Sequence, residues 1–572
     1  MHDLVIRGGR IVDGTGAPAV DGKDIAVDDG VITEIGDGVG RGRWEIDADG
    51  RLVLPGWVDV HTHYDGQATW DPDLTPSVWH GVTSTVFGNC GVGFAPLRPG
   101  SQDYLINLME GVEDIPGTVL AEGIDFTWTT FEEYLDTLEA TPRTMDVGAQ
   151  IPHGALRFYV MGERGADHTE VPTESEVDEM ADAVARALDA GALGFSTSRT
   201  TKHKAADGRL TPSLTAAEPE LAGIARAMAR AGRGMIQCNS DFGPGEVELL
   251  TEMARISGRP VSVLLLQTDS DPERWRHTLD GIRRANDEGL AMTGQVGCRP
   301  IGILMGLDTS VNPFGNHPAF RALADLPVPE RAARLRNDGE LRTALLDHPR
   351  DDGFTRWMTY ALTRACELGD PPNYEPDPAV DSMAARADAI GGSPWELALD
   401  LLAQGDGETV LLYPFENYHA GNLDVIREML VDEHTICGLG DGGAHVATIC
   451  DASYPTFLLS HWARDRTRGP GIELERLVAK QTRDTALAFG LRDRGVLAPG
   501  YRADVNVVDF DGLGVDVPRV AHDLPAGGRR LVQRSHGYDH TLVAGVEVSA
   551  GGELTGARPG RLLRGGTPGP AR

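Results

Sequence analysis

Val58-Asp59-Val60-His61-Thr62-His63 ends an apolar run that begins at Leu52 and is interrupted by a Pro-Gly turn. Such a run is typical of a short buried strand. In an extended segment, side chains two positions apart face the same side, so His61 and His63 can converge while Thr62 faces away. Two converging imidazoles can form part of a metal site, but an isolated His-x-His pair is more often buried and hydrogen-bonded. The surrounding sequence therefore decides between a metal site and a buried, hydrogen-bonded pair.

That surrounding sequence resembles a known family. Leu54 to His63 reads Leu-Pro-Gly-Trp-Val-Asp-Val-His-Thr-His, which resembles the first barrel strand of the amidohydrolase superfamily. Other stretches are similar to its N-acyl-D-amino-acid deacylase branch: His63–Gln67, Phe87–Pro96, Gly191–Thr197, Gly438–His445 and Gly500–Val508. The resemblance covers most of the chain. It implies a TIM-type barrel flanked by a split β-sandwich, and a metal-dependent hydrolase.

Length and composition describe a globular chain with an unusual charge. The chain has 572 residues, of which 41% are hydrophobic, enough for a large core and more than one domain. Its formal net charge of -34 argues against a nucleic-acid partner, because phosphate binding needs a basic face. We interpret the excess of carboxylates as a solvated surface.

No stretch of the sequence predicts membrane targeting. The N-terminus lacks the basic and apolar regions of a secretory signal, and no apolar run approaches the roughly 18 residues that span a bilayer. The six cysteines are widely scattered and are expected to be reduced. We therefore expect a cytoplasmic protein that binds a small-molecule amide and neither nucleic acid nor membrane. A homo-oligomer is compatible with the sequence.

The two ends of the chain share short β-prone runs separated by Gly and Asp turns. This pattern predicts one domain built from residues 1–54 and 490–558, which the resemblance implies is a split β-sandwich. Residues 55–489 are predicted to form the barrel, with a helical insertion at about residues 300–400. Residues 559–572 are rich in Gly, Pro and Arg, which predicts a flexible tail.

Within the central region, apolar runs alternate with amphipathic stretches, as in a parallel α/β barrel. The predicted strands, whose number favours a TIM-type (β/α)8 closure, are Leu54–Val60, Thr83–Gly88, Met145–Ile151, Ala192–Ser196, Met235–Asn239, Val261–Gln267, Ala291–Val296 and Thr435–Gly440. The helical insertion follows strand seven. We interpret it as a lid, because excursions from the carboxyl end of a barrel strand lie over the mouth.

The carboxyl ends of the predicted strands carry the candidate metal ligands. His61 and His63 follow strand one, Cys90 follows strand two, and Asp441 follows strand eight. Zinc accepts imidazole, thiolate and carboxylate. The resemblance implies that Cys90 is a ligand and that one or two zinc ions bind. Asp441 is also the predicted catalytic residue, which takes a proton from water and passes it to the leaving amine.

Five further residues are predicted substrate contacts. Arg199, past strand four, could pair with a substrate carboxylate through its planar guanidinium group, although a surface ion pair explains such an arginine equally well. The others are Tyr64, Asn89, Ser198 and His445. His445 could also orient the catalytic carboxylate from behind.

Two positions depart from the deacylase pattern. The resemblance implies a histidine at the end of strand five and another at the end of strand six, which complete a tight zinc site. Asn239 and Gln267 stand there instead, and neutral amide oxygens bind zinc weakly. The tight site is therefore in doubt. His203, in the loop after strand four, could enter the site, but an exposed side chain is the simpler interpretation of a lone loop histidine.

These patterns predict a metal-dependent hydrolase of carbon-nitrogen amide bonds other than peptide bonds. The resemblance implies an N-acyl-D-amino acid as substrate. Two alternatives stay open. One is an amidohydrolase acting on a cyclic or other small amide, and the other is a metal-poor binding protein on the same scaffold.

Overall fold

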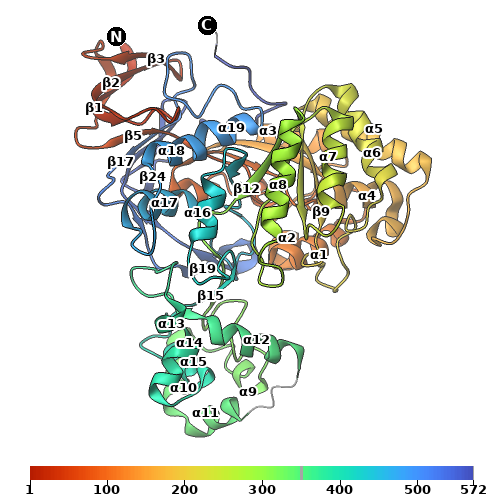
Figure 1. Cartoon of the computed structure of the whole chain (residues 1–572), viewed down its shortest axis with the longest axis vertical. Helices are drawn as coiled ribbons and strands as arrows, with labels where there is room; N and C mark the ends of the chain where they lie inside the picture. The colour runs from red at the N-terminus through yellow and green to blue at the C-terminus, as the bar shows by residue number, and fades with distance from the viewer. Residues whose placement is uncertain (348–351, 571–572) are drawn as a thin grey trace.

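A parallel barrel forms the centre of the molecule (Figure 1). The computed structural model describes residues 1–347 and 352–570. Its barrel strands neighbour one another in chain order: β6 (Trp57–Asp59), β7 (Val82–Phe87), β8 (Asp146–Pro152), β9 (Gly194–Arg199), β10 (Met235–Ser240), β11 (Val261–Leu264), β12 (Met292–Val296) and β16 (Thr435–Cys437). Each lies within a few residues of a predicted strand. The predicted fold class is therefore confirmed.

The predicted first strand divides between two sheets. Leu52–Pro55 forms β5 of a sheet outside the barrel, and Trp57–Asp59 forms β6. The chain crosses at Gly56, where a Cβ atom would lie 2.3 Å from Thr83 Oγ1. A larger residue would displace the start of β7. The segment that carries the two histidines is thus held between both sheets.

The first and last barrel strands meet just beyond their carboxyl ends. The His63 amide donates to the Gly442 carbonyl at 2.8 Å, and the Asp441 amide donates to the His61 carbonyl at 2.9 Å. These two bonds continue the barrel where β6 and β16 themselves are short. They also bring the predicted catalytic aspartate next to both histidines.

Helices cover the outside of the barrel, and Figure 1 shows α7 and α8 side by side over the strands. The helix bounds are α1 (Gln102–Glu113), α2 (Gly117–Gly123), α3 (Phe131–Ala140), α4 (His153–Met161), α5 (Glu174–Ala190), α6 (Glu218–Ala231), α7 (Glu246–Ser257), α8 (Arg274–Asp287), α16 (Asp424–Leu430), α17 (Tyr454–Ser460), α18 (Leu474–Ala479) and α19 (Thr485–Ala488). The longest, α5, begins with a capping box between Thr173 and Glu176, which satisfies free amides of its first turn.

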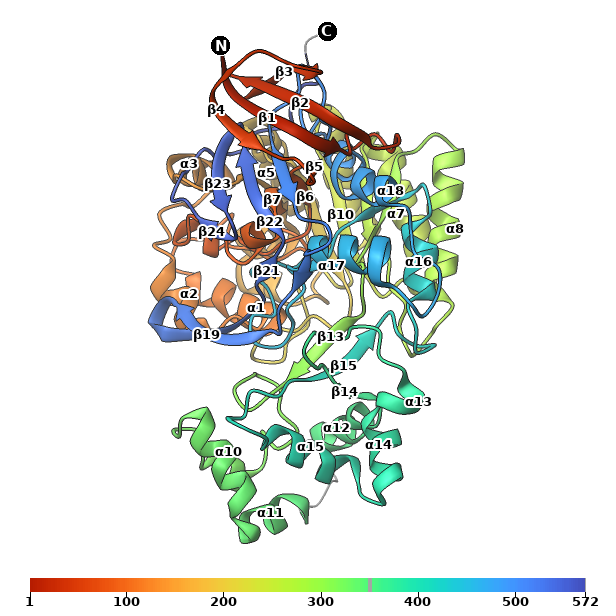
Figure 2. The same cartoon turned by 90° about the vertical axis from the view of Figure 1, so that its left-hand side faces the viewer.

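Strands from both ends of the chain join in one sheet, and Figure 2 shows the N-terminal strands in red next to the C-terminal strands in blue. The sheet contains β1 (His2–Ile11), β2 (Val20–Asp28), β3 (Val31–Gly36), β4 (Gly42–Asp47), β5, β17 (Val505–Val508), β22 (Tyr538–Val543), β23 (Val546–Ala550) and β24 (Glu553–Leu554). The two halves meet where β5 pairs antiparallel with β17 and Val53 lies opposite Val507. Both side chains are buried in the same apolar cluster. Smaller pairs are β18 (Gly514–Val515) with β21 (Ser535–His536), and β19 (Arg519–Leu524) with β20 (Gly528–Val532).

The insertion after β12 is a separate lobe with its own apolar core (Figures 1 and 2). A small sheet of β13 (Ile301–Met305), β14 (Cys366–Glu367) and β15 (Leu411–Glu416) connects it to the barrel. Its helices are α9 (Pro318–Arg321), α10 (Val328–Asn337), α11 (Gly339–Leu346), α12 (Gly353–Arg364), α13 (Pro378–Asp381), α14 (Met383–Ile390) and α15 (Pro394–Leu402). Residues 348–351 of the predicted insertion lie outside the described residues.

The insertion contacts the mouth of the barrel. Asp269, which follows β11, accepts a hydrogen bond from the Tyr360 hydroxyl of α12 at 3.0 Å. Its other oxygen lies 3.1 Å from His419 Nδ1, just after β15. Lys202 of the loop after β9 pairs with Glu416 of β15. The insertion therefore contacts loops at the mouth of the barrel.

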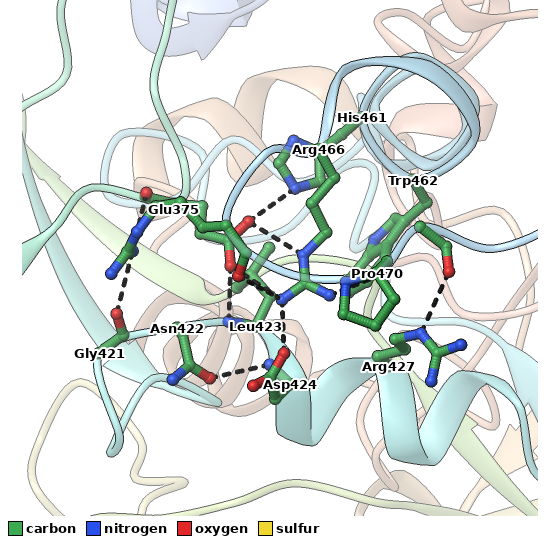
Figure 3. A network of polar contacts seen from close by, with 12 residues as sticks. Glu375, Gly421, Asn422, Leu423, Asp424, Arg427, His461, Trp462, Arg466 and Pro470 are labelled. Carbon is green, nitrogen blue, oxygen red and sulfur yellow. Dashed lines mark hydrogen bonds and ion pairs between the residues drawn. The ribbon is translucent and has the colours of Figure 1, made fainter.

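A buried carboxylate joins the insertion to the side of the barrel (Figure 3). Glu375, between β14 and α13, lies 3.0 Å from His461 Nε2 and 3.0 Å from Arg466 Nη2. It also accepts the Leu423 amide at 3.0 Å. His461 begins a short π-helical turn (His461–Asp465) after α17, and Leu423 precedes α16. One side chain thus connects three segments that are distant in sequence.

The predicted flexible tail is instead packed against the barrel. The Gly560 amide donates to the Arg143 carbonyl at 2.9 Å, and the Leu563 amide donates to the Val147 carbonyl at 2.7 Å. Leu563 is 2% exposed. The buried leucines, the backbone hydrogen bonds and the ion pairs of Arg564 together hold the segment beside β8, which composition alone does not reveal. Residues 571 and 572 lie outside the described residues.

Within residues 1–347 and 352–570, the structure contains no helix that is both long and apolar enough to cross a membrane.

Candidate metal centre

Four predicted ligands converge at the barrel mouth. The Cys90 thiol lies 3.3 Å from His61 Nε2, and the donor atoms of His61, His63 and Cys90 lie within 4.8 Å of one another. Asp441 Oδ1 lies 3.6 Å from His61 Nε2 and 3.7 Å from His63 Nε2. Side chains from three separate strand ends therefore surround one point.

An unusual backbone conformation orients the side chains of Cys90 and Asp441 toward this point. Cys90 and Asp441 have φ angles of +54° and +47°, a conformation that residues with a Cβ rarely adopt. The Cys90 amide donates to Gln237 Oε1 at 2.8 Å, which holds this turn against β10. Strained backbone at both positions is typical of functional sites, where surrounding contacts maintain it.

Burial keeps both histidines neutral near pH 7. It lowers the pKa of His61 to about 4, although a hydrogen bond to Gln295 opposes the shift. It lowers the pKa of His63 well below its usual value, and the neighbouring histidines act in the same direction. Neutral imidazole has a free lone pair, which is the form that binds metal. Burial also raises the pKa of Cys90 and of Asp441 well above their usual values.

The donor set fits zinc. Two imidazole nitrogens, a thiol and a carboxylate are the ligands that zinc prefers, and three protein ligands leave a place for water in a catalytic site. A buried thiol is deprotonated when a metal binds it, so the raised pKa of Cys90 does not argue against this role. His61 and His63 are 1% and 2% exposed, whereas the Asp441 side chain is 11% exposed. Asp441 thus lies on the open side.

Two residues that the sequence did not predict lie next to Nδ1 of the histidines, the ring nitrogen opposite the one that faces Asp441. Gln295 of β12 has its Oε1 2.6 Å from His61 Nδ1, and its amide nitrogen donates to Ser262 Oγ at 3.0 Å. Glu113, the last residue of α1, has its Oε1 3.2 Å from His63 Nδ1. Gln295 lies within a predicted strand and could have been proposed from its polarity. No sequence signal places Glu113, because α1 is part of a long excursion.

The predicted role of Arg199 in binding a substrate carboxylate is not supported by the structure. Its guanidinium group forms a two-pronged pair with Glu246, with Nε–Oε2 at 2.7 Å and Nη2–Oε1 at 2.9 Å. Its third nitrogen donates to the Ala216 carbonyl at 2.8 Å. All three nitrogens are engaged, because Arg199 ends β9 beside the start of α7. The ion-pair interpretation is the one that the structure supports.

Tyr64 and Asn89 are part of the scaffold. The Tyr64 hydroxyl lies 2.7 Å from Ser77 Oγ, and the residue is fully buried. The Asn89 amide donates to the carbonyls of Val60, Thr62 and Val86, and its oxygen accepts from Gln150. Both side chains therefore face the protein, so a direct role in substrate binding is not supported.

Ser198 is buried, whereas His445 is partly exposed. Ser198 Oγ lies 3.1 Å from His203 Nδ1, which turns this loop histidine inward. His203 Nε2 lies 3.2 Å from the Asn239 amide nitrogen, which in turn is 3.8 Å from the Cys90 thiol. His445, whose side chain is 26% exposed, lies 3.6 Å from Glu113. His203 thus borders the site, and its interpretation as an exposed loop side chain is wrong.

Asn239 and Gln267 have different surroundings. Asn239 borders Cys90, where the resemblance implies a histidine. Gln267 faces the returning insertion, since its amide donates to Asn417 Oδ1 at 2.7 Å and its Oε1 accepts the His419 amide at 3.3 Å. Gln267 is therefore a structural residue.

The fold and the site together define the class. A model of the amidohydrolase family matches residues 45–549, and the chain belongs to this family. It is therefore a hydrolase of carbon-nitrogen bonds other than peptide bonds.

Within that family, several relatives are deacylases. The chain is 28% identical to an N-acyl-D-glutamate deacylase of Alcaligenes xylosoxydans xylosoxydans, over 98% of this chain and 96% of the relative. A D-aminoacylase of the same organism is 26% identical, over 98% and 97%. The crystal structure of N-acyl-D-glutamate deacylase from Bordetella bronchiseptica, complexed with zinc and a phosphonate mimic of the tetrahedral intermediate, has a TM-score of 0.66 at 27% identity, over 98% and 99%.

Proposed function

We propose that this chain is a zinc-dependent deacylase of N-acyl-D-amino acids. The observation that carries the proposal is the position of Asp441, whose Oδ1 lies within 3.7 Å of both His61 Nε2 and His63 Nε2. The D-configuration rests on the activities named for the relatives. A single zinc ion is proposed, because Asn239 and Gln267 replace two histidine ligands of the deacylase pattern.

His61, His63 and Cys90 would hold the ion, with Asp441 at its open side. When bound, zinc supplies Lewis acidity that polarises the amide carbonyl and lowers the pKa of water. Asp441 accepts a proton from the attacking water and gives it to the leaving amine nitrogen. Burial raises the pKa of Asp441, which makes its carboxylate a stronger base.

A cavity beside the site could receive the rest of the substrate. It has a volume of about 200 Å³ and adjoins the centre through Asn239. Apolar residues such as Leu265 and Trp275 line it together with the cations Lys202 and Arg274. We propose that this mixed lining contacts a small amino acid; Lys202 and Arg274 already pair with Glu416 and Asp271.

The test combines metal analysis with assays of paired N-acyl-D- and N-acyl-L-amino acids. We expect the full chain to carry zinc and to hydrolyse the D-isomers, and Asp441→Asn to lose about a thousandfold in kcat/KM. Asp465→Asn, on a side chain that is 51% exposed, serves as the control and should keep full activity.

Other outcomes would favour the alternatives. Zinc with turnover of only cyclic or other small amides would move the substrate class away from N-acyl amino acids. A chain that takes up no zinc and hydrolyses none of these amides would contradict the deacylase proposal and favour a binding protein on the same scaffold.

A further inference from the structure

Glu113 is a buried carboxylate that the proposed chemistry does not use. It is 1% exposed, and neither of its oxygens has a hydrogen bond of normal geometry within the described part of the chain. Leaving a carboxylate in such surroundings is costly unless a cation or a donor compensates. Glu113 also ends α1, where the helix dipole disfavours negative charge. Local structure therefore gives no reason for a carboxylate here.

Two ring nitrogens of the metal centre face this carboxylate. His63 Nδ1 lies 3.2 Å from Oε1, and His445 Nε2 lies 3.6 Å from Oε2. The other ring nitrogen of His63, Nε2, lies 3.7 Å from Asp441 Oδ1. His63 thus lies between two carboxylates, one on each side of its ring.

The backbone around Glu113 is fixed to the loop that carries Asp441. The His445 amide donates to the Glu113 carbonyl. The next residue, Asp114, has a φ of +53° and accepts the Thr448 hydroxyl at 2.6 Å. The end of α1 is therefore held beside residues 445–448, only a few positions after Asp441.

His61 shows the same arrangement with a neutral partner. Its Nδ1 lies 2.6 Å from Gln295 Oε1, and its Nε2 faces Asp441 at 3.6 Å. A proton on Nδ1 leaves Nε2 free to bind a metal, and an acceptor behind the ring fixes that tautomer. Each histidine therefore has a protein acceptor behind it.

We propose that Glu113 is a positioning residue of the metal centre. Its carboxylate accepts a hydrogen bond from the protonated Nδ1 of His63 and so keeps Nε2 directed at the ion. This rests on the proposed zinc site. The adjacent negative charge makes the His63 imidazole a stronger electron donor to the ion. Because Glu113 also contacts His445, it connects His63 to the loop that carries Asp441. Glu113 itself does not bind the ion or touch the substrate.

The test measures zinc affinity by competition with a chelator, on the full chain and independently of turnover. We expect Glu113→Gln to weaken zinc binding by about 10- to 100-fold, the usual cost of losing such a partner. Glu113→Asp keeps the charge and should restore part of the affinity; it also serves if the glutamine variant does not fold. Cobalt-substituted protein should show a shifted absorption spectrum in Glu113→Gln.

The matched control is Glu220→Gln, which removes another buried carboxylate from a histidine, since Glu220 Oε1 lies 2.9 Å from His153 Nε2. We expect it to lower the melting temperature and leave zinc affinity within about twofold of the unmodified chain. Unchanged zinc affinity in Glu113→Gln would overturn the inference alone. Complete loss of zinc binding there would identify Glu113 as a direct ligand and also overturn it. An unmodified chain that binds no zinc would overturn this inference and the proposed function together.

Discussion

At the scale of single residues, we expect the charge of Arg199 to stabilise the fold and not to bind the substrate. Its side chain is 10% exposed and its partner Glu246 is 20% exposed, so substitution leaves a partly buried carboxylate unpaired. We expect Arg199→Met to lower the free energy of unfolding by about 2 kcal/mol, a typical value for hydrogen bonds between charged groups. The KM of an N-acyl amino acid should change by less than about twofold. Denaturant titration and steady-state kinetics measure the two effects.

Arg209→Met is the control for that substitution, because Arg209 also pairs with a carboxylate but its side chain is 49% exposed. It should change stability by less than about 1 kcal/mol. A tenfold rise in KM for Arg199→Met at unchanged stability would instead restore the role in carboxylate binding that the sequence suggested.

At the scale of elements, Glu375 governs how the insertion is attached. Burial opposes its charge, but hydrogen bonds from His461, Arg466 and the Leu423 amide outweigh burial and lower the pKa of Glu375 to about 2 (Figure 3). A carboxylate whose pKa is lower in the folded protein stabilises the fold above its unfolded pKa, and this contribution disappears as the pH falls toward 2. From the usual 4.5, the contribution is on the order of 3 kcal/mol.

We therefore expect Glu375→Gln to unfold at a lower temperature at pH 7, with a deficit that shrinks as the pH falls below about 4.5. Thermal unfolding between pH 7 and 3 measures this. Asp424→Asn is the control, because Asp424 pairs with the same Arg466 but its side chain is 62% exposed. A deficit for Glu375→Gln that stays constant across this pH range would show that shape, and not charge, holds the junction.

At the scale of the whole molecule, a buried cation joins the barrel to the terminal sheet. Arg494, 1% exposed, lies 2.8 Å from Asp146 at the start of β8 and 3.6 Å from Asp504 just before β17. Removing it would take one cation from a buried cluster in which Arg502 also pairs with Asp146 and Asp504, and would leave their negative charge only partly compensated. We expect Arg494→Met to lower the free energy of unfolding by about 3–5 kcal/mol, measured by denaturant titration.

Arg561→Met is the comparison, because Arg561 lies 3.8 Å from the same Asp146 with a side chain that is 56% exposed. It should cost less than about 1 kcal/mol, as exposed pairs do. Equal losses for the two variants would mean that the Arg494 cluster does not join the two sheets more strongly than a surface contact.

The sequence by itself predicted the barrel, the sheet built from both ends of the chain and the residues that we propose as metal ligands. Strand periodicity and turn residues are local properties, so the eight strands were found to within a few residues. Because parallel strands in a barrel end at one face, His61, His63, Cys90 and Asp441 could be expected to meet without knowledge of any distance.

Only the tertiary structure decided what stands behind those ligands and which charges are already paired. Glu113 lies fifty residues from His63 in sequence, on a helix whose docking no local pattern predicts. Whether Arg199 forms an ion pair was open until α7 placed Glu246 against it, and residues 559–570 were expected to be flexible until Leu563 was seen buried beside β8. Such pairings depend on how elements pack. Packing depends on the shapes of many side chains that are distant in sequence, whereas the hydrophobic periodicity of a strand or helix is a property of a few adjacent residues.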